Sequence, residues 1–411
     1  MKKLLIFVVA LFAIAACSKK NEMKEGPWLG VLQIDPADRS MDVNFNMNYS
    51  LNEQGNPQFI ITNADEKIVV DEITKNGDTL LIRLPVFTSE IVAVFQNDSL
   101  IGKYFPKGKS AGNYYKFFAL AGITDRFPNN TNKSDFNVTG RWKIIENGGT
   151  PDSTIMVGEF KQDGDRVIGT FLNTTGDYRY LEGKVSGNKF LLSAVDGSHT
   201  FIITADLTNE NTMENGRFMG SPKWVSTWRA ERNDKIELPT NEELVWVKKG
   251  MSTFDFAGID MNGQKVTSKD ERFQGKVLAV LAGGSWCPNC LDEARLFSEL
   301  YSKYKDKGFE VVALNFEDKT YETSKIKMER FIKQTGANYT FLYVSPRGGA
   351  KRDSVLYPIE GKMAFPTGMF IDKLGHIRKV ETGFSGPGTG EHYTKFVDET
   401  TKLIELLLSE K

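Results

Sequence analysis

The sequence predicts a multidomain protein in which two mostly antiparallel β domains, each a small barrel or sandwich, precede an α/β domain. Up to about residue 232, apolar and polar residues alternate with a period of two, as in strands that bury one face. Turn signals such as Asp163-Gly164 separate these short runs. From residue 242 onward, continuous apolar runs alternate with helical periodicity, which is typical of a central sheet covered by helices. The length of 411 residues allows this many domains.

Residues 1–17, MKKLLIFVVALFAIAAC, predict a secretory signal, because two lysines precede an apolar run that is short for a membrane span. The ending Ile14 to Cys17 resembles the lipobox of bacterial lipoproteins, which implies cleavage before Cys17 and lipidation of its thiol. Residues 18–25 would then form a tether, and lipid chains would hold the protein at a membrane of the bacterial cell envelope, facing the periplasm. An ordinary signal peptide cut nearby and an uncleaved anchor are the alternatives, and the choice of inner or outer membrane stays open.

The two β domains are expected at residues 26–127 and 138–232, joined by the polar segment PNNTNKSDFN. In MDVNFNMNYSL every second residue from Met41 to Leu51 is apolar, which predicts a strand with one buried face. Both domains open with a Gly, a Trp and a strand, in GPWLGVLQI and TGRWKIIEN. The second domain is therefore either a repeat of the first or an unrelated β domain. Their aromatic residues are expected in the cores, with a ligand pocket as the alternative.

Residues 242–411 predict the α/β domain. KVLAVLAGG and FEVVALNF are continuous apolar runs, as expected for strands buried on both faces. Apolar residues recur at helical spacing from Cys290 to Lys305, in SKIKMERFIKQTG up to Gly336, and in the last twenty residues. YTFLYV, PTGMFIDK and HIRKVETG complete the predicted sheet.

The sequence contains three cysteines, so Cys287 and Cys290 are the only thiols of the mature chain if Cys17 carries lipid. An exported chain meets an oxidising compartment, where disulfides form. A c-type haem site would need His after the second cysteine, and that residue is Leu291. A structural zinc needs about four ligands, and the three histidines form no ligand pattern, so no metal is expected. A structural disulfide across so small a loop would stabilise little. A redox-active Cys287–Cys290 disulfide fits best.

The position of the pair explains its chemistry. Cys287 follows a buried strand and begins a helix, where free N–H groups and the helix dipole stabilise a thiolate. Pro288 is tolerated in the first helical turn. We therefore expect Cys287 to be the exposed nucleophile and Cys290, one turn later, the more buried resolving thiol. The charges of Asp292 and Glu293 in the same turn would oppose the thiolate, so no extreme pKa is expected.

The segment GQKVTSKDERFQGKVLAVLAGGSWCPNC resembles the thioredoxin fold, and specifically the TlpA/ResA-like thiol-disulfide oxidoreductases of bacterial envelopes. The resemblance covers residues 254–411 and does not reach the β domains. It implies an enzyme that exchanges disulfides with protein thiols and disulfides and needs no cofactor. The family's turn, strand entry and W-C-x-x-C motif correspond to Asn262-Gly263, Gly275-Lys276 and Trp286 to Cys290.

The segment MAFPTGMFID resembles the part of thioredoxins that carries a cis proline facing the disulfide. The resemblance implies that Pro366 takes this position. It also implies that Trp286, Pro288, Phe365 and Thr367 line the substrate groove. A trans proline that starts an edge strand is the alternative.

The proton acceptor is the main departure from thioredoxins. Thioredoxins carry a buried Asp six residues before the first cysteine, and Leu281 stands there. TlpA/ResA-like proteins place a Glu after the next strand, which implies Glu317, or Asp318 in the alternative register, as the group that takes the proton of Cys290. A solvated acid that caps the next helix is the other interpretation. The glycine-rich residues 381–393 lack the context of a phosphate loop and are expected to shape the groove near Pro366.

The predicted function is an envelope thiol-disulfide oxidoreductase. The resemblance favours the reductase direction, which would require a membrane electron donor. The net charge of -1 and the absence of long like-charge runs give no sign of a nucleic-acid partner. One alternative is a peroxiredoxin-like peroxidase, which would need Thr or Ser at the position of Gly284. Another is a binding lipoprotein whose β domains hold a ligand or partner.

Overall fold

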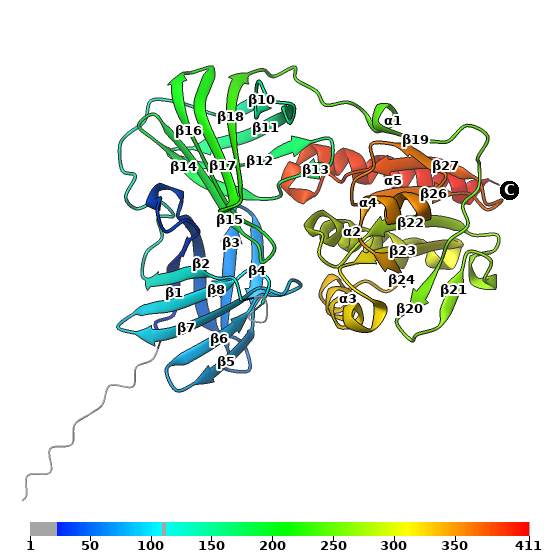
Figure 1. The fold of residues 1–411 in the computed structure, drawn as a ribbon, viewed down its shortest axis with the longest axis horizontal. Helices are drawn as coiled ribbons and strands as arrows, with labels where there is room; N and C mark the ends of the chain where they lie inside the picture. The colour runs from blue at the N-terminus through cyan, green and yellow to red at the C-terminus, as the bar shows by residue number, and fades with distance from the viewer. Residues whose placement is uncertain (1–22, 109–111, 411) are drawn as a thin grey trace, which may run out of the picture.

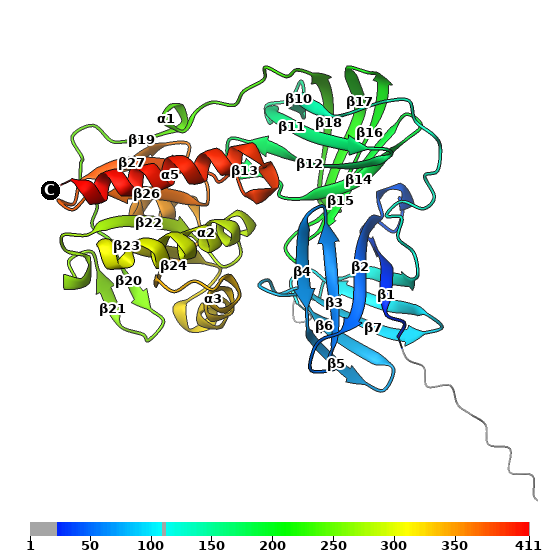
Figure 2. The same cartoon turned by 180° about the vertical axis from the view of Figure 1, so that it is seen from behind.

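The computed structural model describes residues 23–108 and 112–410. The predicted signal peptide, the lipidation site Cys17 and most of the tether lie outside these residues. Two β units lie one above the other, and an α/β unit lies beside both (Figure 1). The same arrangement is visible from behind (Figure 2). The predicted fold class, two antiparallel β domains followed by an α/β domain, is confirmed.

The first β unit is a nine-stranded antiparallel sheet in the order β4-β3-β2-β1-β9-β8-β7-β6-β5. Only Asp71 separates β4 from β5, so the two ends of the sheet must curl toward each other into a barrel-like shape. Every second residue from Met41 to Tyr49 is buried as predicted, whereas Leu51 is 49% exposed at the end of its strand. The strands are β1 (Gly26–Gln33), β2 (Val43–Leu51), β3 (Pro57–Asn63), β4 (Glu66–Val70), β5 (Glu72–Asn76), β6 (Thr79–Arg83), β7 (Glu90–Gln96), β8 (Ser99–Phe105) and β9 (Tyr115–Ala121).

The second β unit is a closed antiparallel barrel. Its strand order is β11-β10-β18-β17-β16-β15-β14-β12-β13, and an additional pairing of β11 with β12 closes the barrel, with the two-residue β13 attached to β12. Aromatic side chains, among them Phe171, Phe190 and Phe218, fill its core as expected. The strands are β10 (Gly140–Glu146), β11 (Thr154–Asp163), β12 (Arg166–Asn173), β13 (Gly176–Asp177), β14 (Leu181–Ser186), β15 (Lys189–Val195), β16 (Thr200–Asn209), β17 (Thr212–Ser221) and β18 (Trp224–Arg232).

The α/β unit has a seven-stranded sheet in the order β21-β20-β24-β23-β22-β26-β27, in which β22, β23 and β24 run parallel. A two-stranded β19–β25 sheet lies beside it. The strands are β19 (Val245–Val247), β20 (Ala257–Asp260), β21 (Lys265–Thr267), β22 (Val277–Gly283), β23 (Phe309–Glu317), β24 (Thr340–Pro346), β25 (Ile359–Gly361), β26 (Thr367–Ile371) and β27 (Ile377–Thr382).

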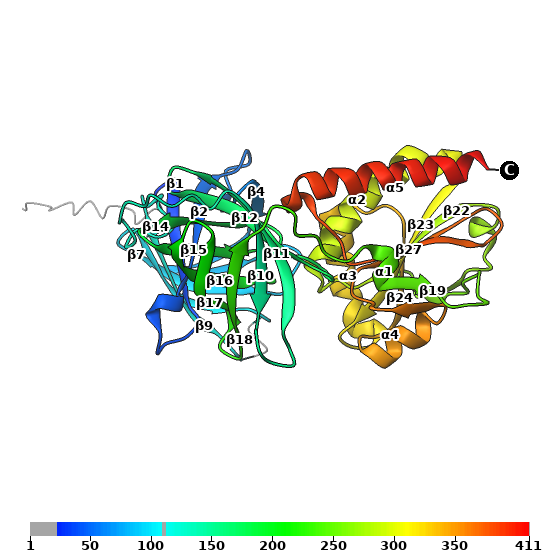
Figure 3. The ribbon, with the colours of Figure 1, turned by 90° about the horizontal axis from the view of Figure 1, so that it is seen from above.

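Helices cover both faces of this sheet. Side chains of α2, α3 and α5 pack on one face, and α4 with the chain around Phe254 packs on the other. The view from above shows α5 along the top of the unit and α4 below it (Figure 3). The helices are α1 (Asn241–Leu244), α2 (Pro288–Tyr304), α3 (Tyr321–Thr335), α4 (Gly349–Val355) and α5 (Glu391–Ser409). Among the described residues, no helix is both long and apolar enough to cross a membrane.

The β units contact the α/β unit through both apolar and charged side chains. Val86 and Phe87 of the first β unit join an apolar cluster with Leu291 of α2 and Phe331 of α3. Arg330 of α3 donates to the backbone carbonyl of Leu84. The first β unit therefore packs against α2 and α3 of the α/β unit.

Candidate active site

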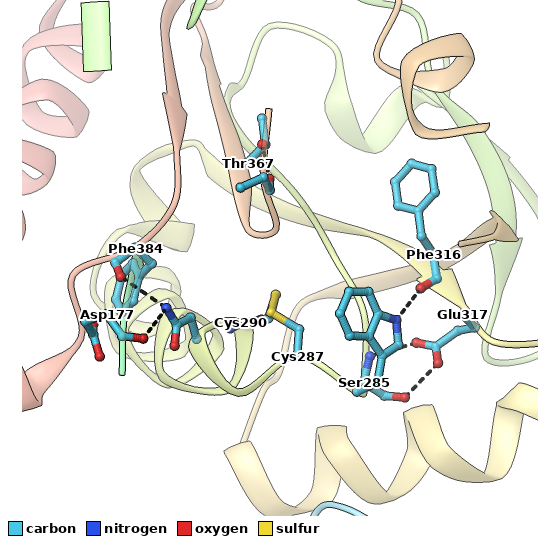
Figure 4. Close-up of a disulfide and its surroundings, with 11 residues drawn as sticks. Asp177, Ser285, Cys287, Cys290, Phe316, Glu317, Thr367 and Phe384 are labelled. Carbon is cyan, nitrogen blue, oxygen red and sulfur yellow. Dashed lines mark hydrogen bonds between the residues drawn. A yellow bond between two sulfur atoms is a disulfide. The ribbon is translucent and has the colours of Figure 1, made fainter. Parts of the chain in front are cut away.

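Cys287 and Cys290 form a disulfide at the N-terminus of α2, with their Cα atoms 5.2 Å apart (Figure 4). Every residue of β22 is buried, and this strand delivers the chain to the helix at a fixed point. Cys287 is the N-cap residue, and the backbone N–H of Cys290 donates to its sulfur at 3.2 Å. In the dithiol state, this N–H and the helix dipole would stabilise a thiolate on Cys287.

The exposure of the pair differs from our expectation. Cys287 is only 4% exposed and Cys290 5%, so the predicted contrast between an exposed and a buried cysteine is wrong. Pro288 and Asn289, between them, are half-buried. The side chain of Asn289 donates to the backbone carbonyl of Asp177 in the second β unit. A segment more than a hundred residues away therefore packs beside the cysteines, which no local pattern could indicate.

The structure brings the other predicted groove residues to the disulfide. The Phe365–Pro366 peptide bond is cis, and the following Thr367 is fully buried at the start of β26. The rings of Trp286 and Phe365 meet edge to face, with centroids 5.6 Å apart. The indole N–H of Trp286 donates to the carbonyl of Phe316 at 2.7 Å, which fixes the ring.

Glu317 lies at the Trp286 side of the pair. Its two carboxylate oxygens accept hydrogen bonds from the backbone N–H and the hydroxyl of Ser285, at 2.8 and 2.7 Å. Burial raises the pKa of Glu317, although the bonds from Ser285 oppose that shift. The neighbouring Asp318 forms an ion pair with Arg347 at 2.6 Å. Glu317 is thus positioned to hold the turn that leads into the motif.

A second buried acid, Glu293, lies on the other side of the pair. It follows Cys290 by three residues, so both side chains lie on one face of α2. Both line a cavity of about 20 Å³ together with Gly283 and Tyr339, which is enough room for one water molecule. Burial, and secondarily the charge of Glu381, raise the pKa of Glu293 well above its usual value. Glu293 was not among the predicted site residues, although its three-residue spacing from Cys290 indicates that the two side chains share a helix face.

The charge of Asp292 is balanced by the second β unit. The Arg179 guanidinium contacts both carboxylate oxygens of Asp292, at 2.9 and 3.2 Å. Both side chains are almost fully buried, at 3 and 4% exposed. Since Arg179 pairs with Asp292, the charge of Asp292 opposes a thiolate on Cys287 less strongly than the sequence suggested.

Comparisons with known proteins agree with this geometry. The family model described as Redoxin matches residues 247–395. The thiol-disulfide oxidoreductase ResA of Bacillus thuringiensis subsp. konkukian is 30% identical over 162 residues, which cover 39% of this chain and 83% of that protein. ResA of Geobacillus thermodenitrificans is 31% identical over 141 residues, or 34% of this chain and 73% of that protein.

Among solved structures, the thioredoxin domain of a thiol-disulfide oxidoreductase from Bacteroides vulgatus aligns at 25% identity with a TM-score of 0.27, over 37% of this chain and 99% of that chain. The site combines a C-x-x-C disulfide at a helix N-terminus with a cis proline, and the relatives' matches cover most of their own length. The chain therefore belongs to the TlpA/ResA-like family of thioredoxin-fold proteins and is a thiol-disulfide oxidoreductase.

Proposed function

We propose that this oxidoreductase reduces disulfides of protein substrates through its W-C-P-N-C motif. The observation that carries the proposal is the Cys287–Cys290 disulfide at the N-terminus of α2, with the ring of Phe365, the residue before the cis proline, packed against Trp286 of the motif. A helix N-terminus stabilises the thiolate that attacks a disulfide. The resemblance to TlpA/ResA-like proteins supports the reductase direction.

The reaction begins with the dithiol form. The thiolate of Cys287 attacks one sulfur of the substrate disulfide, forming a mixed disulfide and releasing one substrate thiolate. Cys290 then loses its proton and attacks the sulfur of Cys287. The mixed disulfide breaks, the second substrate thiolate leaves, and the Cys287–Cys290 disulfide forms. Two electrons pass from the protein to the substrate, so a donor must reduce the pair before the next cycle.

The substrate would bind beside Phe365. Within the described residues, none of the backbone hydrogen bonds found outside helices and strands uses the N–H or carbonyl of Phe365. These groups can therefore pair with an extended substrate chain that crosses the groove. Trp286 and Pro288 would form the rest of its surface. Thr367, which the sequence also placed in the groove, is fully buried, and its hydroxyl donates to the backbone carbonyl of Ala364 instead.

Glu293 is our preferred acceptor for the proton of Cys290. It shares the small cavity with Cys290, and one water molecule there could carry the proton to the carboxylate. A raised pKa suits such a group because its carboxylate then has a higher affinity for the proton. Glu317 remains the sequence-based candidate, but both of its oxygens accept bonds from Ser285. We assign Glu317 the positioning of the turn before Trp286.

We further propose that the protein works in the bacterial envelope, attached through lipid on Cys17. The support is the N-terminal sequence alone: a basic start, a short apolar run and the ending IAAC. The proposed organisation is a signal peptide of residues 1–17, a tether of 18–25, β domains at 26–127 and 138–232, and a thioredoxin-like domain at 242–411. A membrane-bound electron donor would reduce the pair.

The test is the reduction potential of the Cys287–Cys290 pair in a soluble chain that starts near Met23. The protein is equilibrated in thiol buffers of known potential, its free thiols are trapped, and the products are weighed. A value near that of thioredoxin, about −270 mV, supports the reductase. A value near that of the strong periplasmic oxidants, about −120 mV, would reverse the proposed direction.

A further inference from the structure

The turn between β12 and β13 packs against the disulfide end of α2. Asn289, between the two cysteines, donates to the backbone carbonyl of Asp177 at 3.2 Å and to that of Phe384 at 3.5 Å. Thr174 accepts a hydrogen bond from Lys362, which lies four residues before the cis proline. Figure 4 shows Asp177 and Phe384 at one end of the disulfide and Ser285 and Glu317 at the other. The turn therefore closes one end of the space in front of the sulfur atoms.

Glycines allow this close approach. A Cβ atom at Gly176 would lie 2.2 Å from Nδ2 of Asn289. A Cβ atom at Gly383 would lie 2.8 Å from the backbone carbon of Thr175, and one at Gly388 would lie 3.0 Å from the backbone of Arg179. At Gly383 the contacts are with backbone atoms, so a side chain there would require the backbone to shift, whereas at Gly176 the side chain of Asn289 would have to move. The glycine-rich loop after β27 thus serves to receive a segment of the second β unit.

Buried charges hold this segment in place. The carboxylate of Asp177 accepts hydrogen bonds from the backbone N–H groups of Arg179 and Gly386, the latter at 2.6 Å. Arg179 in turn pairs with Asp292 of α2. Charge-assisted bonds between buried groups have well-defined geometry. The segment is therefore a fixed part of the site.

We propose that residues 174–179 of the second β unit form one wall of the substrate groove and restrict exchange at Cys287 to disulfides carried by extended, flexible segments, with Asp177 as the positioning residue of that wall. This inference rests on the proposed disulfide exchange at Cys287. A mixed disulfide requires the two sulfurs to come within about 2 Å of each other. With Cys287 only 4% exposed beside a fixed turn, a broad folded surface cannot bring its sulfur that close. An extended, flexible segment can present its disulfide without a broad surface around it, so it is the substrate that such a wall admits.

The test compares three disulfides on the reduced full chain at pH 8. They are glutathione disulfide, a short unstructured peptide dimerised through one cysteine, and a small folded domain dimerised through one surface cysteine. Each rate is divided by the rate of the same disulfide with dithiothreitol, which corrects for intrinsic reactivity. We expect the folded domain to react at least about tenfold more slowly than the peptide. Asp177→Asn, which replaces one of the two acceptor oxygens by an N–H donor, should raise the ratio of the folded-domain rate to the peptide rate about tenfold.

Asp163→Asn is the matched control, because Asp163 lies in the exposed hairpin at the other end of β12. It should leave all three ratios unchanged. Equal corrected rates for the peptide and the folded domain in the unsubstituted chain would overturn the proposal that residues 174–179 restrict the substrate. An unchanged ratio in a folded Asp177→Asn protein would do the same. If that variant does not fold, Gly383→Ala, which pushes the turn outward, replaces it. Failure of the proposed exchange is distinct, since then glutathione disulfide and the peptide would not react either.

Discussion

At the scale of single residues, the site is governed by which acid is charged and what each acid contacts. Asp292, Glu293 and Glu317 all lie close to the cysteines in sequence or in space, yet their surroundings differ. Arg179 balances the charge of Asp292, and Ser285 donates hydrogen bonds to the carboxylate of Glu317. Glu293 lines a small cavity beside Cys290. Of the three, only Glu293 shares a cavity with the thiol that must lose a proton. Its environment therefore suits proton transfer.

Substitution of the two candidate proton acceptors separates their roles. Glu293→Gln should slow the attack of Cys290 on the mixed disulfide by about a hundredfold, since general base catalysis contributes on that order. Glu317→Gln should leave this step within about threefold and instead shift the fluorescence of Trp286, whose turn it supports. Trapped mixed disulfide, quantified by mass spectrometry over time, reports the step. A larger slowing by Glu317→Gln than by Glu293→Gln would return the role to Glu317.

Asp177 gives the protein a specific dependence on pH. Burial raises its pKa from 3.8 to about 6. Because the folded pKa lies above the unfolded value, the stability that protonated Asp177 contributes is complete below about pH 4 and is lost as the pH rises through 6. Between pH 3 and pH 8, the free energy of unfolding should fall by about 3 kcal/mol relative to that of Asp177→Asn. Urea titrations of both proteins across this range measure the difference, and a parallel course would contradict it.

At the scale of elements, α2 does two tasks at once. Its first turn carries the cysteines, and its Leu291 and Ala294 pack against Val86 and Phe87 of the first β unit. The Cys290–Glu293 face and this apolar face lie on the same short helix. Loss of the β unit would therefore expose apolar surface next to the redox pair.

Phe87→Ala tests the strength of this contact. Phe87 is 7% exposed, and truncating a buried Phe costs roughly 3–5 kcal/mol through lost burial and the remaining cavity. We expect a loss of about 3 kcal/mol in the free energy of unfolding of the full chain, measured by urea titration. Leu120→Ala is the control, because Leu120 is 45% exposed and should change stability by no more than about 0.5 kcal/mol. Equal effects of the two substitutions would argue against the contact.

At the scale of the whole molecule, one arginine joins all three units. Arg179 of the second β unit pairs with Glu66 of the first at 2.6 Å, with Asp196 of its own unit at 3.2 Å and with Asp292 of α2 at 2.9 Å. All four side chains are at most 10% exposed. Buried carboxylates that lose their cation are costly, so this junction fixes the units relative to the active site.

Arg179→Met should therefore lower the free energy of unfolding by about 3–5 kcal/mol, because it leaves three buried carboxylates without their shared cation. It should also raise the pKa of the Cys287 thiol, since the charge of nearby Asp292 would then be opposed only by the more exposed Arg295, at 3.4 Å. Ultraviolet absorbance of the thiolate across a pH titration measures that pKa. Arg229→Met is the control, because Arg229 is half-exposed and pairs only with exposed Glu231. A Cys287 pKa unchanged by Arg179→Met would show that the junction has no electrostatic effect on the site.

The sequence by itself determined the fold class, the redox pair and the cis-proline segment as candidates. Short local patterns indicate these features: period-two alternation, continuous apolar runs and a C-x-x-C motif between a strand and a helix. Gly336 indeed ends α3 in a left-handed conformation. The short helix α4 was not predicted, because its sequence GAKRDSV has no apolar periodicity. The apolar periodicity of α2 begins only at Cys290, whereas the helix begins at Pro288 after the N-cap Cys287, as the position of the motif indicated.

Only the tertiary structure decided how the site is enclosed and which acids serve it. Asn289 contacts Asp177, and Arg179 pairs with Asp292, so segments about 110 residues apart meet at the site. Cys287 is buried there. No local pattern encodes such a contact, because it depends on how separate domains dock. The structure also decided the surroundings of the two acids: Glu293 lines the cavity beside Cys290, and Glu317 accepts hydrogen bonds from Ser285. Local chemistry specifies what a thiol pair can do, and the docking of the β domains determines what can reach it.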